Sequence, residues 1–208
     1  MQVKKEKNKK SWLVIIGFLL VFSGLCLIIY HFVSNKQIVN QEEDAIKEFY
    51  IQEQEIIKKD ESTEEPKEEK EVKEQKKIEY IAVLKIPKIN LVRGLVDPNS
   101  YLNNISYNVA FLDNSAMPDK ENGNVILAAH SGTARISYFR NLDKLIIGDE
   151  VTIDYKSITY RYKVVSIYDI EKTGTAKIVR NKDISTLTLV TCRHNTNRQI
   201  IVICESIK

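Results

Sequence analysis

The sequence predicts an all-β domain behind an apolar N-terminal segment and a charged stalk. From residue 78 onward, short β-branched runs are punctuated by Pro, Gly, Asn and Asp, which is typical of strands and turns. No long alternation of strands and helices occurs, which disfavours a parallel α/β sheet. About eight such runs in about 130 residues indicate a closed barrel or a sandwich.

The N-terminal segment has the composition of a membrane anchor. Residues 12–33 contain no Asp, Glu, Lys or Arg, and a span needs roughly 20 such residues. Residues 1–11 form a basic tail, with five lysines against one glutamate. Basic flanks stay in the cytoplasm, so we expect a single-pass protein of the cell membrane with its N-terminus inside. A cleaved signal peptide is the alternative, but the run ends without small residues at a cleavage site.

Residues 34–77 are predicted to be a stalk. Between residues 41 and 77 the chain has 14 acidic and 8 basic residues. Residues 41–59 combine helix formers with spaced apolar residues, so a helix that continues from the membrane is expected. Residues 60–77 are almost all charged and include Pro66, which predicts a disordered spacer.

The folded domain is expected to span residues 78–208. Two turns are well marked by sequence, Pro87-Lys88-Ile89-Asn90 and the segment 119–123, which ends in Asn-Gly. A short helix is expected at 136–145, ended by Gly148. The expected strands are 80–86, 91–94, 109–112, 124–129, 150–155, 158–170, 186–191 and 198–205.

The charge of the folded domain does not indicate nucleic-acid binding. The whole chain carries a formal +3, and residues 78–208 carry 17 basic and 13 acidic residues. A mildly basic domain without Lys/Arg clusters interleaved with aromatic residues does not indicate nucleic-acid binding, so none is expected.

Three residue types that suit thiol-based acyl transfer end strand-like runs. Cys192 ends Thr188-Leu189-Val190-Thr191, His130 follows the apolar run 125–129, and Arg198 lies just past a polar turn. A thiolate can attack a carbonyl, an imidazole can move protons, and a guanidinium can hold the oxyanion. If residues 193–197 form a five-residue turn, Arg198 lies directly opposite Cys192.

The other cysteines and histidines have simpler interpretations. In that hairpin Cys204 lies about 20 Å along the strand from Cys192, beyond the reach of a disulfide. Cys192 is therefore expected to be a free thiol and Cys204 a core residue. His194 competes with His130 for the acid/base role, but it lies in the predicted turn, where the direction of its side chain is not fixed.

These motifs resemble the sortase family, the membrane-anchored cysteine transpeptidases of Gram-positive bacteria. Thr188–Cys192 matches the TLxTC motif, and Arg198 is placed on the next strand. The segments Ala129-His130-Ser131-Gly132, Phe139-Arg140-Asn141-Leu142, Gly148-Asp149-Glu150-Val151 and Ile86-Pro87-Lys88-Ile89 match as well. The resemblance implies a closed eight-stranded β-barrel with short helices.

The resemblance also implies an activity. Cys192, His130 and Arg198 would be catalytic, with Ser131, Thr188 and Thr191 as substrate-binding candidates. The thiol would cleave a C-terminal LPxTG-like sorting signal of secreted proteins through a thioacyl intermediate. An amine of a peptidoglycan precursor or a pilin would accept the acyl group. No metal site or other cofactor is expected, and calcium dependence is left open.

Two other classes stay open on the residues alone, an extracellular thiol hydrolase and an inactive binding module on a stalk. The interval between Cys192 and Arg198 is shorter than in the better-known sortase classes, which leaves the subclass open. The sorting signal, the amine acceptor and the oligomeric state are left open too.

Overall fold

A computed structural model of the chain describes residues 3–60, 78–173, 177–193 and 195–207. The chain divides into two compact units, Met1–Asp44 and Ala45–Lys208. The first unit holds most of helix α1 (Val3–Asp60), and the second holds the end of that helix and all the strands. The stalk segment at 61–77, predicted to be disordered, lies outside the described residues.

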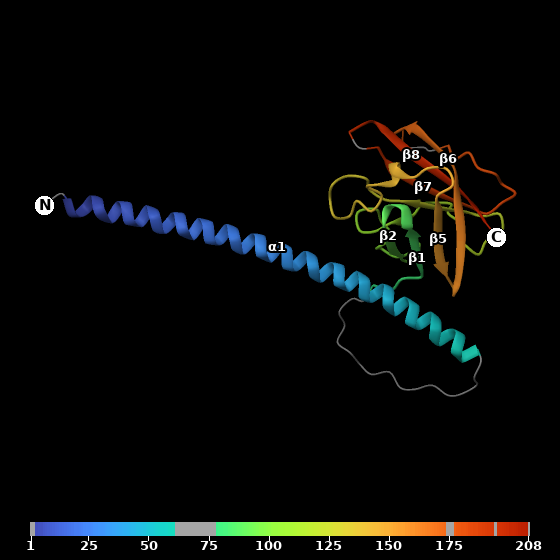
Figure 1. Cartoon of the computed structure of the whole chain (residues 1–208), viewed down its shortest axis with the longest axis horizontal. Helices are drawn as coiled ribbons and strands as arrows, with labels where there is room; N and C mark the ends of the chain where they lie inside the picture. The colour runs from blue at the N-terminus through green and yellow to red at the C-terminus, as the bar shows by residue number, and fades with distance from the viewer. Residues whose placement is uncertain (1–2, 61–77, 174–176, 194, 208) are drawn as a thin grey trace. The chain divides into compact units, whose positions relative to one another are not determined.

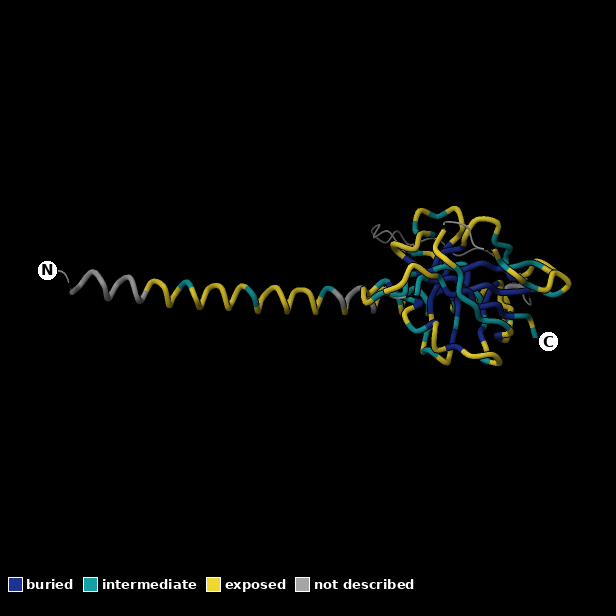
Figure 2. The backbone as a smooth tube through the Cα atoms, turned by 90° about the horizontal axis from the view of Figure 1, so that it is seen from above, coloured by how far each residue is buried: buried dark blue, intermediate teal, exposed yellow. Residues whose placement is uncertain are grey.

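Helix α1 contains a segment that suits a membrane. Among the described residues one stretch, Trp12–Ser34, is long and apolar enough to span a bilayer, with a mean hydropathy of 2.8. Its large apolar side chains are exposed in the chain alone, and the helix is coloured mostly as exposed in Figure 2. This is compatible with the single-pass anchor that the sequence predicts.

Eight strands form one sheet that curls into a nearly closed barrel (Figure 1). The hydrogen-bonded order is β2-β1-β5-β6-β8-β7-β4-β3. The neighbouring strands are antiparallel except for β4 and β7, which are parallel. The strands are β1 (Ala82–Ile86), β2 (Leu91–Leu95), β3 (Ala110–Phe111), β4 (Asn124–Ala128), β5 (Glu150–Tyr155), β6 (Ile158–Glu171), β7 (Thr186–Cys192) and β8 (Arg198–Ser206).

All eight predicted strands are therefore present, most within one or two residues of the expected ends. The predicted helix at 136–145 is wrong. That segment is made of turns and ends in a short 3-10 helix, η2 (Leu142–Lys144). Phe139 and Leu142 are fully buried there, so tertiary packing of two side chains holds the segment.

The first turn of the barrel follows its sequence closely. Pro87 opens the 3-10 helix η1 (Pro87–Ile89), where its fixed φ suits the first helical position. Asn90 ends it with a φ of 52°, a left-handed conformation that Asn tolerates. On β2, a Cβ at Gly94 would lie 2.3 Å from the ring of Tyr80, so only glycine fits this close approach.

β2 and β3 are the two outermost strands of the sheet, and buried polar side chains bridge the seam between them. The Nε of Arg93 donates to the Oδ1 of Asn108 at 2.6 Å, and the Nδ2 of Asn108 donates to the carbonyl of Gly94 at 3.0 Å. Arg93 also lies over the Tyr138 ring, 4.1 Å from its centroid. Both members of the pair are almost fully buried, so these bonds tie β2 to the segment that enters β3.

The end of helix α1 packs on the outside of β1 and β5 within the second compact unit. Phe49 is 6% exposed and belongs to a cluster with Tyr80, Val83 and Val96. The hydroxyl of Tyr50 donates to Asp154 Oδ2 at 2.6 Å. Lys85 makes an ion pair with the same oxygen at 2.7 Å, and Thr159 donates to Oδ1 at 2.7 Å.

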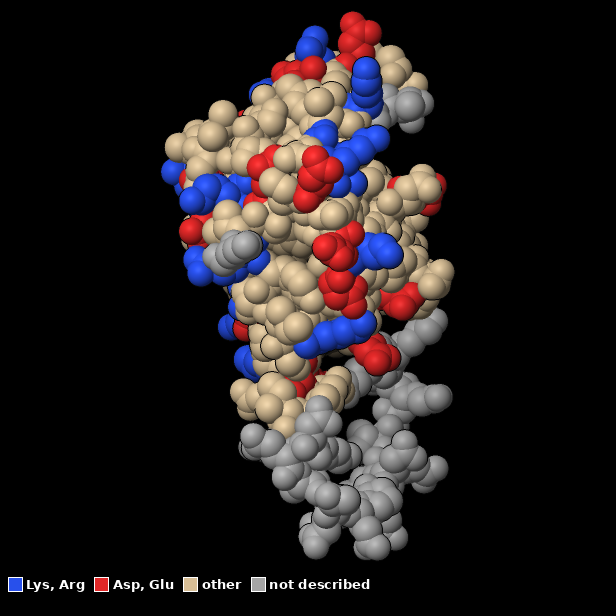
Figure 3. Space-filling model, turned by 90° about the vertical axis from the view of Figure 1, so that its right-hand side faces the viewer, with Lys and Arg blue, Asp and Glu red and all other residues tan. Residues whose placement is uncertain are grey.

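The surface charge is mixed. On the face shown in Figure 3, basic and acidic side chains are interspersed, without an extended patch of one sign. On this face the structure has the same mixture of charges as the sequence.

Candidate active site

His130 and Cys192 lie at the C-terminal ends of two neighbouring parallel strands, β4 and β7. The two strands are parallel, with Ala128 beside Val190. Continuing that register by two residues places His130 beside Cys192, and adjacent strands lie about 4.8 Å apart. Side chains of residues paired in this way project from the same face of the sheet. The imidazole of His130 and the thiol of Cys192 would therefore be attached at adjacent backbone positions on one face.

Cys192 is the only residue of β7 that is not buried. The six residues before it are fixed in the barrel, and the thiol is free and partly exposed at the strand end. Cys204 is a contrast: it is a free, fully buried thiol of the core, and burial raises its pKa to about 12. A nucleophile must be reachable and able to ionise, so Cys192 is the reactive candidate of the two.

The loop after β4 is tied to the nucleophile strand. The hydroxyl of Ser131 donates to the carbonyl of Cys192, and the Phe139 amide donates to the carbonyl of His130 at 3.0 Å. Phe139 is itself fully buried, so it anchors the backbone that carries the histidine. These bonds hold residues 130 and 131 against the end of β7.

Thr188 and Thr191 hold the two strands together. The Thr191 hydroxyl donates to the carbonyl of Ala129 at 2.7 Å, and the Thr188 hydroxyl donates to Asn124 Oδ1 at 2.9 Å. Both threonines are buried. Their hydroxyls are used within the protein, and the substrate-binding role predicted for them stays a prediction that this geometry does not favour.

The predicted register between Cys192 and Arg198 is wrong by one residue. Cys192 pairs with Gln199, and the amide of Arg193 donates to the carbonyl of Arg198 at 2.8 Å. The turn therefore has four residues, 194–197, in place of the predicted five. Because side chains alternate along a strand, Arg193 and Arg198 lie on one face of the hairpin and Cys192 starts on the other.

An acidic residue that the sequence did not single out joins the two arginines. Asp169 on β6 accepts from Arg193 Nη2 through its Oδ1 at 2.8 Å, and its Oδ2 lies 3.8 Å from Arg198 Nε. Its carbonyl accepts from Arg198 Nη2 at 3.2 Å. The only signal in the sequence is a charged residue inside an otherwise apolar stretch of strand. Its meaning depends on the β6–β8 register.

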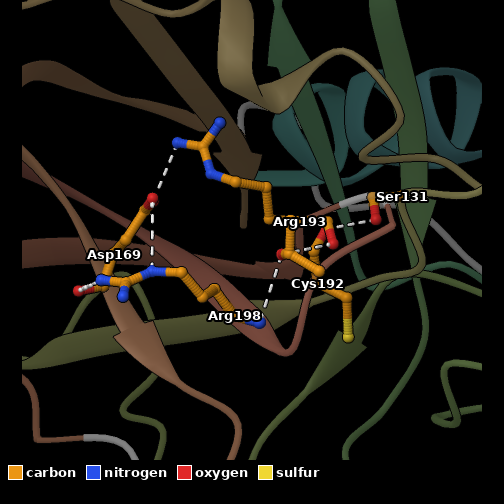
Figure 4. Close-up of polar contacts among 6 residues, drawn as sticks. Ser131, Asp169, Cys192, Arg193 and Arg198 are labelled. Atoms are coloured by element: carbon orange, nitrogen blue, oxygen red, sulfur yellow. Dashed lines mark hydrogen bonds and ion pairs between the residues drawn. The ribbon is translucent and has the colours of Figure 1, made fainter.

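Figure 4 shows how these side chains lie. The guanidinium groups of Arg193 and Arg198 converge on Asp169, while the sulfur of Cys192 points away from them. The hydrogen bond to Asp169 raises the pKa of Arg193 further above its usual value. Both arginines are thus permanent cations beside the strand end that carries the thiol.

Two remaining expectations concern other residues. His194, the alternative acid/base residue, lies outside the described residues. Among the residues that the structure describes, no group of three or more His, Cys, Asp or Glu side chains is arranged to hold a metal ion.

Comparison with known proteins identifies the family. The model of the sortase domain matches residues 84–207. The chain belongs to the sortase family. The match covers all strands from the middle of β1 onward, and it includes His130, Cys192 and Arg198. Among curated proteins, none matches the chain significantly.

Solved sortases share the fold. A sortase D5 transpeptidase from Clostridium perfringens is 28% identical, covers 81% of this chain and 99% of that chain, and has a TM-score of 0.59. Sortase C1 from Streptococcus agalactiae is 25% identical, covers 65% and 71%, and has a TM-score of 0.55. A lid mutant of sortase A from Corynebacterium diphtheriae is 21% identical, covers 62% and 70%, and at a TM-score of 0.55 shows the fold alone.

Proposed function

We propose that this sortase is a cysteine transpeptidase that cleaves a C-terminal sorting signal of secreted proteins and transfers the acyl group to an amine. The observation that carries the proposal is the parallel register of β4 and β7, which pairs Ala128 with Val190 and, continued by two residues, would put His130 beside Cys192. Membership of the sortase family supports the same activity.

The reaction has two steps. The thiolate of Cys192 attacks the carbonyl carbon of the scissile bond, and the resulting oxyanion is stabilised by hydrogen-bond donors. The C–N bond then breaks, and the leaving amine takes a proton from His130. An incoming amine loses its proton to His130 and attacks the thioester, which releases the thiolate. Arg198 is the proposed oxyanion donor.

The face that carries Cys192 is apolar and buried along the strands that lead to the thiol. Ile126, Val190, Ile201 and Ile203 form a second apolar cluster on that face, with Ala128 and Ile178 packed against it. Along β4 and β7 this cluster leads directly to His130 and Cys192. Because these side chains are buried, a sorting signal would meet the site at the strand ends, where Cys192 is partly exposed.

The N-terminal segment supports the cellular setting. One apolar helix, Trp12–Ser34, has the length and composition of a membrane anchor. With the basic tail inside, the catalytic domain would face the cell exterior, where secreted proteins and the amines of peptidoglycan precursors or pilins meet.

The proposal is tested with a panel of LPxTG-like peptides, with and without an amine acceptor. We expect Cys192→Ala to abolish both cleavage and the covalent adduct, while Cys204→Ala leaves the adduct in place. Products that carry the added amine show transfer, and free acid alone would identify a hydrolase. Cleavage by Cys192→Ala at the wild-type rate would refute the assignment of the nucleophile.

A further inference from the structure

The pairing of two arginines across the β7–β8 hairpin is unusual in electrostatic terms. Arg193 and Arg198 are directly opposite each other, and like charges in that position destabilise a strand pair. A single carboxylate, Asp169, contacts both. Asp169 is the more sheltered partner, with a side chain 26% exposed against 38% for Arg193 and 49% for Arg198.

The strand register explains why Asp169 can do this. On β6 the residue opposite Arg198 is Glu171, and Asp169 is opposite Ile200, two positions further along. Asp169 and Glu171 therefore share a face with both arginines. A diagonal neighbour in a sheet is within reach of a long side chain, and the guanidinium of Arg198 extends to the diagonal carboxylate.

The strand register places Arg198 on the face opposite Cys192, and the contact with Asp169 holds its side chain there. Its Nε and Nη2 both face Asp169, one toward the carboxylate and one toward the carbonyl. In Figure 4 this turns the guanidinium away from the Cys192 sulfur. To reach a carbonyl oxygen bound at Cys192, Arg198 has to leave Asp169.

We propose that Asp169 is a positioning residue that retains Arg198, together with Arg193, on the side of the hairpin away from the thiol, and that substrate recruits Arg198 by displacing it from this carboxylate. The proposal rests on the proposed function, in which Arg198 is the oxyanion donor. Arg193 holds the Asp169 carboxylate in place, because its contact with Asp169 is 2.8 Å long and that of Arg198 is 3.8 Å long.

The expected effect is modest because the contact is partly exposed. Ion pairs of this kind shift an equilibrium by no more than about fivefold. Removing the negative charge with Asp169→Asn should therefore raise kcat/KM for a sorting-signal peptide by about two- to fivefold, since Arg198 no longer has to be detached. A side chain that only supported the fold would lower activity when it was removed.

Glu171 is a matched control on the same strand. It faces Arg198 directly in the register, yet among the described residues it makes no ion pair with either arginine. Glu171→Gln removes the same charge from the same neighbourhood without removing the contact. It should leave kcat/KM within about 1.5-fold of wild type.

The decisive experiment is a double-mutant cycle in the full-length protein, with kcat/KM measured for Asp169→Asn, Arg198→Ala and the double variant. We expect the gain from Asp169→Asn to vanish in the Arg198→Ala background, because the gain acts through that arginine. A gain that persists without Arg198, a loss of activity in Asp169→Asn, or an equal gain in Glu171→Gln would overturn the proposal.

A second measurement does not need turnover and so separates this proposal from the proposed function. The pH dependence of Cys192 alkylation by iodoacetamide is followed by peptide mass spectrometry. The titratable and charged groups around this end of the hairpin are His130 from the end of β4, Arg193 and Arg198 from the hairpin itself, Asp169 and Glu171 from β6, and Asp143 from η2.

In Asp169→Asn the midpoint of alkylation should move to lower pH, by a few tenths of a unit to about one unit, because a freed guanidinium stabilises the thiolate. Arg198→Ala should remove most of this shift. The same shift in Glu171→Gln, or no shift in Asp169→Asn, would refute retention of Arg198. Absence of any transpeptidation with an intact shift would refute only the proposed function.

Discussion

Replacing Tyr50 with Phe should weaken the docking of the end of α1 on the barrel by a predictable amount. The hydroxyl donates to Asp154, a carboxylate that is 8% exposed. A hydrogen bond to a charged group contributes about 1.5–3 kcal/mol. Asp154 keeps Lys85 and Thr159 after the substitution, so the loss should lie near the lower end, at about 1.5 kcal/mol.

The assay is urea and thermal unfolding of a chain that begins at Ala45, the first residue of the second compact unit. For a domain of this size the loss corresponds to a fall in Tm of about 3–6 °C and a lower urea midpoint by about 0.5–1.5 M. Tyr107→Phe, which removes a hydroxyl from a side chain that is 56% exposed, is the matched control. A Tyr50→Phe variant as stable as this control would refute the reasoning.

The effect should depend on pH at both ends. Burial and the hydrogen bond to Asp154 raise the pKa of Tyr50 to about 12, so its contribution is complete below about pH 10 and is lost as the pH rises through 12. Burial alone would raise the pKa of Asp154, but hydrogen bonds from Lys85 and Tyr50 outweigh it and lower that pKa. The contribution of Asp154 is therefore present above about pH 4 and is lost as the pH falls through its lowered value.

Other changes test the site and the barrel. His130→Ala should lower kcat/KM by at least about 10²-fold, a usual acid/base contribution, and a loss below tenfold would move the role elsewhere. Arg198→Lys should be nearly as damaging as Arg198→Ala, at about 10²–10³-fold, because lysine lacks the planar fork; a lysine variant within tenfold of wild type would leave only a charge role. Asn108→Ala should destabilise the barrel by about 2–3 kcal/mol in urea unfolding, since the hydrogen bond from the buried Arg93 Nε to Asn108 Oδ1 is lost. A chain without residues 1–77 should still unfold cooperatively, but at lower urea than one that keeps the end of α1.

Most of the secondary structure of the domain could be predicted from local residue patterns. Alternating β-branched runs predicted all eight strands, because burial of one face of a strand is written directly into its sequence. The sequence of 136–145 predicts a helix that is absent, because the apolar residues of this segment include two anchors, Phe139 and Leu142, that pack into the barrel from turns. Arg93 and Asn108 bridge the seam between β2 and β3. Local patterns do not predict this pair, because the two strands meet only in the folded protein.

The sequence by itself determined the apolar anchor segment, the strand content and the three residues proposed for catalysis, since each depends on composition or on a motif of a few neighbouring residues. Only the tertiary structure decided that β4, which leads to His130, runs parallel to β7, which ends in Cys192, because the pairing joins residues 62 positions apart, such as Ala128 and Val190. It also decided that Arg198 faces Asp169. The turn between β7 and β8 is one residue shorter than predicted, so Gln199 takes the place of Arg198 opposite Cys192. Relative to Cys192, each β8 side chain therefore lies on the other face from the one predicted, and no local pattern specifies the length of that turn.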